Sequence, residues 1–188
     1  MDGHFTGYAS LFGVPDLGRD VVVRGAFAES LARRGPGGVR LLWHHDPAEP
    51  IGRWLALRED ARGLRVEGRL NLAVQRAREV AALMREGGLD GLSIGFRTLS
   101  AAPDRAGYRQ LRAVDLWELS LVTFPLQPGA RADPPAGPLA AEIRSVARRL
   151  APRRVPPLAP TLAPSLAPSR TPLPAHRPAI RLRPAARA

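Results

Sequence analysis

The 188-residue chain contains no cysteine and no lysine. Without cysteine it has no disulfide bonds, no thiol nucleophile and no cysteine-ligated zinc. No apolar run approaches the roughly 18 residues that a transmembrane helix needs. The N-terminus also lacks the basic and apolar regions of a signal peptide. These absences predict a protein that stays in the cytoplasm and does not associate with membranes.

Positive charge comes from arginine alone and is distributed unevenly. Residues 1–142 hold 18 Arg and all 17 acidic residues, whereas residues 143–188 hold 10 Arg and no acidic residue. Of the net charge of +11, all but one unit therefore belongs to the C-terminal quarter of the chain. A nucleic-acid-binding domain would be expected to carry a clustered basic face. The nearly neutral body argues against that class and leaves only the Arg-rich tail as a candidate for binding nucleic acid.

Aromatic residues and prolines divide the chain. All ten aromatic residues precede residue 125, and half of the 20 prolines fall after residue 150. Because a proline-rich segment without large side chains cannot offset its ordering entropy, residues 151–188 are predicted to be a disordered tail. An apolar helical stripe predicts a short amphipathic helix in a linker at 134–150, which packs on the body or is completed by a partner. The folded domain is predicted at 1–133.

Within this domain the hydrophobic period is mostly two, which is typical of β-strands. Two segments have helical spacing instead, 26–34 and 72–86, the second with Asn71 as an N-cap and Gly87 and Gly88 as a stop. The expected strands cover residues 3–14, 20–24, 39–45, 51–58, 63–70, 92–100 and 108–124. Many short strands with two helices predict a mainly β, α+β fold: a closed or nearly closed barrel with helical insertions.

Two neighbouring histidines end one apolar strand, in the segment LWHHD at 42–46. Either imidazole could simply cap the edge of the sheet, or one could act as a base. A metal site needs three or four converging ligands. Only two other histidines are present, His4 and His176. The sequence therefore disfavours metal binding.

A second segment, GLSIGF at 91–96, isolates one hydroxyl. Strand alternation places Ser93 on one face with only Gly91 and Gly95 beside it. Such a hydroxyl is open to the approach of another peptide backbone, which suits a nucleophile. The alternative is that the glycines mark bulges or crowded packing.

A third segment, DLWELSLV at 115–122, places a carboxylate in an apolar strand. Alternation puts Glu118 and Ser120 on one face, and Trp117 and Leu119 on the other. A carboxylate in such a run needs a partner, because an unpaired buried charge is costly. An arginine partner would be structural, whereas a histidine partner would suit the acid of a catalytic triad.

Taken together and in order, these segments resemble the tailed-phage prohead (capsid maturation) proteases, a serine endopeptidase family related to the herpesvirus assemblin proteases. The matching pieces are at residues 7–13, 23–27, 42–46, 51–52, 63–64, 91–96 and 117–125. The resemblance implies a herpesvirus-protease-like β-barrel surrounded by helices.

The resemblance also implies the site. Its nucleophile falls on Ser93, and the position of the family's histidine before an aspartate selects His45 rather than His44 as the base. For the third member Glu118 is the first choice and Asp115 the second, since Asp115 would share a face with Trp117. No cofactor and no metal are implied.

The implied activity is cleavage of the scaffolding segment of the major capsid protein inside the immature procapsid, in the cytoplasm of the bacterial host. Self-cleavage is predicted between residues 133 and 151, separating domain from tail. The expected partner is the capsid protein, with a homo-oligomer left open. Two alternatives remain: an inactive barrel that acts as a capsid scaffold or assembly protein, and an Arg-rich nucleic-acid-binding protein.

Overall fold

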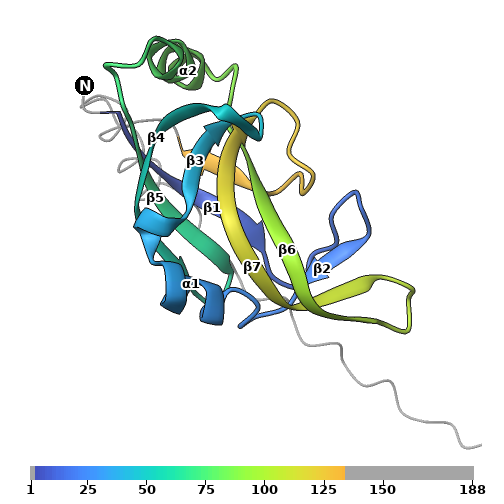
Figure 1. The fold of residues 1–188 in the computed structure, drawn as a ribbon. Coiled ribbons are helices and arrows are strands. Elements are labelled where there is room, and N and C mark those ends of the chain that lie inside the picture. The colour runs from blue at the N-terminus through green and yellow to red at the C-terminus, as the bar shows by residue number, and fades with distance from the viewer. Residues whose placement is uncertain (1–2, 134–188) are drawn as a thin grey trace, which may run out of the picture. The chain divides into compact units, whose positions relative to one another are not determined.

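The computed structural model describes residues 3–133, which form a mainly β fold with two α-helices (Figure 1). This confirms the predicted fold class for the domain. The predicted linker helix and the predicted tail, at 134–150 and 151–188, lie outside the described residues. No helix in the described range is long and apolar enough to cross a membrane.

The elements follow the order in which strands and turns alternate in the sequence. They are β1 (His4–Leu11), β2 (Asp20–Val22), α1 (Ala28–Arg34), a short 3-10 helix η1 (Pro36–Gly38), β3 (Arg40–Trp43), β4 (Asp46–Glu59), β5 (Gly63–Leu70), α2 (Gln75–Glu86), β6 (Gly91–Pro103), β7 (Arg109–Val122) and β8 (Arg131–Asp133).

The strands close into a barrel. Pairing runs in the order β7-β3-β4-β5-β1-β8-β6, and β6 pairs with β7 to complete the circle, while β2 is added beside β7. In Figure 1, α2 lies across one end of the barrel and α1 lies near its side. The contacts agree, because α2 packs on β4 and β5, and α1 packs on β7 and β4. The predicted closed barrel is thus confirmed.

Alternating apolar residues fill the interior. Phe5 and Trp54, on strands at the two sides of β5, meet edge to face with ring centroids 5.6 Å apart. Aromatic pairs in this arrangement are favourable beyond the area they bury. The other fully buried large side chains are Phe27, Leu41, Ile51, Leu64, Leu70, Met84, Leu92, Leu111, Leu116, Leu119 and Leu121.

Helix α2 buries the apolar residues that recur with helical spacing in the predicted segment 72–86. It stops before Gly87, whose positive φ of 77° lets its N–H bond the carbonyls of the last turn. The predicted N-cap is wrong. Asn71 Oδ1 accepts a hydrogen bond from the N–H of Ala73, which makes a local turn, and the helix begins later, after Val74. Asparagine side chains favour such turns as strongly as helix caps.

The strands around the two histidines, and one further strand, also differ from the prediction. β3 ends at Trp43, because a turn occupies the next two residues, and β4 begins at once with Asp46. The short strand β8 was not predicted. Three residues are too few to show a period of two, and the strand exists because β1 and β6 supply partners.

Candidate active site

The two histidines form the turn between β3 and β4. Trp43 pairs with Asp46, so the loop has two residues, His44 and His45, with φ of 49° and 63°. Two consecutive positive φ angles in a two-residue hairpin define a type I′ turn. Histidine tolerates this conformation better than most residues other than glycine, although some strain remains.

The turn sends the two imidazoles to different places. The His44 ring lies 4.1 Å from the Trp43 ring, and its Nε2 is 3.3 Å from Thr123 Oγ1. His45 Nδ1 instead lies 2.6 Å from Glu118 Oε1 on β7. The structure therefore pairs the carboxylate with His45 and not with His44.

Three hydrogen bonds join His45 of the turn and two residues of β7 in a closed cycle. Glu118 Oε1 accepts from His45 Nδ1, Glu118 Oε2 accepts from the Ser120 hydroxyl at 2.6 Å, and Ser120 Oγ accepts from the His45 backbone N–H at 3.0 Å. Ser120 is fully buried. It was predicted only to share a face with Glu118, and its bond to the turn could not be seen because the strands that meet here are far apart in sequence.

This cycle of hydrogen bonds determines which nitrogen of the His45 imidazole is free to accept a proton. Because the Nδ1–H donates its hydrogen bond to the carboxylate, Nε2 of the neutral imidazole is left as the acceptor nitrogen. The hydrogen bond to Glu118 raises the pKa of His45 above its ordinary value, against the opposing effect of partial burial. No arginine in the described range forms an ion pair with Glu118, so its partner is the histidine of the functional interpretation.

Ser93 lies on the neighbouring strand β6, directly across from Ser120, and Gly95 lies across from Glu118. Side chains of directly opposed residues share a face of the sheet. Ser93, Ser120 and Glu118 therefore belong to one face, and Ser93 is partly exposed. Within residues 3–133 the Ser93 hydroxyl makes no hydrogen bond to a side chain or backbone group.

The two glycines beside Ser93 are places of close packing. A Cβ added to Gly95 would lie 1.8 Å from Glu118 Oε1, and one added to Gly91 would lie 2.3 Å from the Val122 carbonyl oxygen. The crowded-packing alternative is therefore what the structure contains at both positions. At Gly95 the absence of a side chain has a role, because it leaves room for the carboxylate that contacts His45.

Asp115, the second choice for the acid, contacts neither histidine. It is 3% exposed and accepts hydrogen bonds from Arg33 and Arg34 of α1 and from Trp117. The bonds from Arg34 and Trp117 hold its pKa well below the ordinary value of a carboxyl group. The geometry therefore favours Glu118 over Asp115 as the partner of the base.

The predicted faces of β7 are partly wrong. Trp117 is 52% exposed, whereas Leu119 is fully buried, so the two do not share a face. The reason is a β-bulge: Gly95 pairs with Glu118 and Phe96 pairs with Leu116, which leaves Trp117 as an extra residue.

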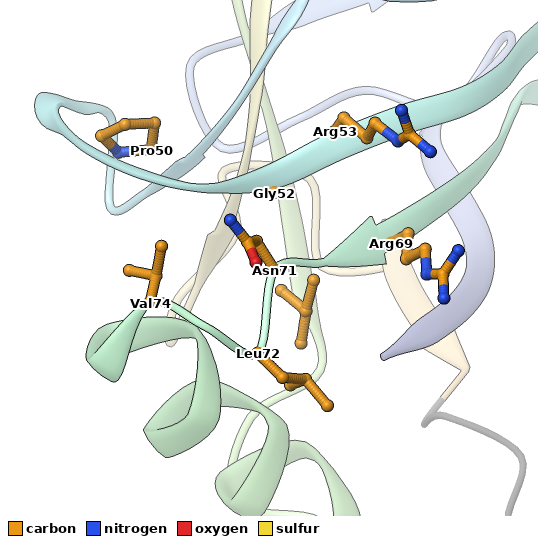
Figure 2. A pocket seen from close by; sticks show the side chains of 8 residues that line it. Pro50, Gly52, Arg53, Arg69, Asn71, Leu72 and Val74 are labelled. Atoms are coloured by element: carbon orange, nitrogen blue, oxygen red, sulfur yellow. The ribbon is translucent and has the colours of Figure 1, made fainter. Parts of the chain in front are cut away.

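A groove of about 670 Å³ is lined by residues of β4, the end of β5 and the segment that leads into α2. Figure 2 shows Arg53 and Arg69 at one end and Pro50 and Val74 at the other. None of His45, Ser93 and Glu118 is among the residues that line it. In the described range no three His, Cys, Asp or Glu side chains converge as metal ligands would.

Two curated proteins are similar in sequence. The prohead protease of Enterobacteria phage HK97 is 34% identical over 128 residues, which is 65% of this chain and 56% of that protein. The prohead protease of Escherichia phage T5 is 34% identical over 86 residues, 45% of this chain and 40% of that protein. The chain thus spans about half the length of the curated relatives it matches.

Solved structures with a similar arrangement include three proteases. The protease of Kaposi's sarcoma herpesvirus, in complex with a hexapeptide phosphonate inhibitor, is 16% identical, covering 69% of this chain and 63% of that one, with a TM-score of 0.47. The varicella-zoster virus protease is 14% identical, covering 79% of this chain and 77% of that one, with a TM-score of 0.44. The bacteriophage T4 capsid assembly protease is 13% identical, covering 70% of this chain and 88% of that one, with a TM-score of 0.46.

A family model covers most of the chain. The family described as Caudovirus prohead serine protease matches residues 1–145, which include every described strand and helix. The match extends over the β3–β4 turn, the Ser93 strand and the Glu118 strand. The family expected from the sequence is confirmed: this chain belongs to the Caudovirus prohead serine proteases.

Proposed function

We propose that the protein is a serine endopeptidase in which Ser93 is the nucleophile, His45 the general base and Glu118 the carboxylate that orients the base. The observation that carries this proposal is the 2.6 Å contact between His45 Nδ1 and Glu118 Oε1 on the sheet face that also bears Ser93. A carboxylate bonded to Nδ1 holds the imidazole in the tautomer that a general base requires.

In this mechanism His45 Nε2 takes the proton of the Ser93 hydroxyl as Oγ attacks the scissile carbonyl carbon. The C–N bond of the tetrahedral intermediate then breaks, and the imidazolium returns its proton to the leaving amine. Water, activated by the same nitrogen, hydrolyses the acyl-enzyme and releases Ser93. The missing bond from Ser93 Oγ is compatible with this role, because catalytic hydrogen bonds are often long in free enzymes and tighten when substrate binds.

Family membership supports a capsid-related substrate. We take this to be the scaffolding segment of the major capsid protein, cleaved inside the immature procapsid in the cytoplasm of the bacterial host. The chain itself is a second substrate, cut between residues 133 and 151. That cut would separate the nearly neutral domain from all or most of residues 143–188, which together hold 10 Arg and no acidic residue.

Co-expression with the major capsid protein tests the proposal. Intact-mass measurement should find a shortened capsid protein with the wild-type protease and a full-length one with Ser93→Ala. Ser100→Ala, an exposed serine on the same strand, is the matched control and should cleave normally. Continued cleavage by Ser93→Ala would remove Ser93 from the role. Normal capsid assembly without cleavage by the wild type would favour the inactive scaffold instead.

Intact mass of the purified protease tests self-cleavage, and a single unshortened species would contradict it.

A further inference from the structure

The β-bulge at Trp117 adjoins the residue that holds the base. Leu116 and Leu119 are both fully buried although they are three residues apart, an odd spacing that strict alternation would split between two faces. The extra residue between them resets the alternation immediately before Glu118. Bulges of this kind commonly re-aim side chains beside active sites.

Asp115 ties the bulged residue down. Trp117 Nε1 donates a hydrogen bond to Asp115 Oδ2 at 2.8 Å. The Trp117 side chain is half exposed, so burial alone does not hold the indole in place. The indole N–H is the single donor that the side chain has. The bond to Asp115 is therefore the polar contact that fixes the bulged side chain.

Asp115 is itself held from outside the strand. Arg34 of α1 donates two bonds to it, at 2.9 and 3.0 Å. Ser30, also on α1, accepts the N–H of Leu116 at 2.9 Å and lies 3.5 Å from Asp115 Oδ1. Arg97 of β6, directly across from Asp115, lies 3.7 Å away. One buried carboxylate thus joins β7, α1 and β6 around the bulge.

We infer that Asp115 is a positioning residue: by clamping Trp117 to α1 it fixes the bulge, and with it the register that turns Glu118 toward His45. Its effect passes through the backbone of β7, since Asp115 contacts neither histidine. The consequence for catalysis rests on the proposed function, whereas the consequence for the His45–Glu118 contact does not.

Two substitutions in the full-length chain test this. Trp117→Phe keeps an aromatic ring, although a smaller one, and removes the N–H donor, and Asp115→Asn removes the charge. In each, the imidazole of His45 should titrate at lower pH in an NMR experiment, because its contact with Glu118 loosens. The acid limb of the kcat profile should move the same way, with kcat falling roughly tenfold or more and KM changing little, as expected when substrate binding is untouched.

Asp20→Asn is the matched control. Asp20 is nearly buried and accepts a hydrogen bond at 2.7 Å from Nε of Arg109, the first residue of β7, away from the bulge. The Asp20→Asn substitution should lower the thermal midpoint of unfolding as Asp115→Asn does. The imidazole of His45 should nevertheless titrate as it does in the wild type.

If Asp115→Asn does not fold, Trp117→Phe decides the matter. A folded Trp117→Phe with wild-type His45 titration and kcat would overturn the inference and leave Asp115 a purely structural residue. Failure of the proposed function would appear separately, as cleavage that survives Ser93→Ala.

Discussion

The carboxylate of Glu118 occupies the space that a side chain at Gly95 would fill. The two residues face each other across β6 and β7, and a Cβ on Gly95 would lie 1.8 Å from Glu118 Oε1. A glycine on one strand is thus the condition for a carboxylate on the next strand to reach a histidine in a third segment. The position of the base is a property of the sheet as a whole.

Gly95→Ala should therefore abolish the proposed peptidase activity without unfolding the domain. The methyl group displaces the Glu118 carboxylate from His45, so we expect kcat to fall by roughly 10²-fold or more, within the range that general-base assistance supplies. Peptide cleavage and circular dichroism measure the two effects. Gly37→Ala, where a Cβ would meet nothing within 4 Å, is the control and should keep full activity. Wild-type activity in folded Gly95→Ala would contradict the geometry.

His45 and His44 should differ sharply in their importance. Asparagine also tolerates positive φ, so His45→Asn and His44→Asn should both keep the turn. His45→Asn should lower kcat by roughly 10²–10⁴-fold, because it removes the proposed general base. His44→Asn loses only the contacts to Trp43 and Thr123 and should stay close to the wild type. Steady-state kinetics decide between them, and the reverse order of effects would assign the base to His44.

The acid limb of the pH profile should depend on Glu118. His45 must be neutral to act as a base, so activity falls as the pH drops through its pKa, which the hydrogen bond that His45 donates to Glu118 raises. Glu118→Gln removes the negative charge and leaves only a weaker, neutral acceptor for the Nδ1–H of His45. The limb should then move to lower pH while the plateau of kcat falls. Glu67→Gln, which breaks a His–Glu contact of 2.7 Å to His4, is the matched control and should leave the profile unchanged.

The same pair should contribute to stability with a defined sign. Because the folded-state pKa of His45 is raised, the contribution is fully present below the ordinary histidine pKa of about 6.5 and is lost as the pH rises through the folded-state value. The thermal midpoint of the wild type relative to Glu118→Gln should therefore be highest in mildly acidic buffer. A difference that grows toward alkaline pH would have the wrong sign.

Ser120→Ala should lower both stability and activity. It leaves the His45 N–H and one Glu118 oxygen without their partner, and a buried group left unsatisfied costs about 1–3 kcal/mol. Denaturant unfolding measures this loss, and kcat should fall because the turn and the carboxylate are no longer linked. Ser10→Ala, which deletes an equally buried hydroxyl on β1, should leave kcat unchanged. An active Ser120→Ala would show that the turn holds His45 without this bond.

Much of the site could be predicted because its parts lie in segments with clear local patterns. The polar residues that interrupt apolar strands, Ser93 and Glu118, stand out by alternation alone. The two glycines beside Ser93 were noticed, but the crowding at Gly95 comes from a residue 23 positions away, which no local pattern contains. The N-cap at Asn71 was wrong because a turn and a cap use the same side-chain oxygen.

The sequence by itself determined the local features of the domain. These are the strands with alternating apolar residues, the apolar face of α2, and the placing of a hydroxyl, two imidazoles and a carboxylate on or at the ends of strands. Those are local properties, set by side-chain chemistry and spacing. Which imidazole meets Glu118, and why Asp115 does not, was decided only in three dimensions. Parallel pairing of β3 with β7, the type I′ turn and the bulge at Trp117 are set by packing of the whole barrel, and each moves a side chain from one face or direction to another.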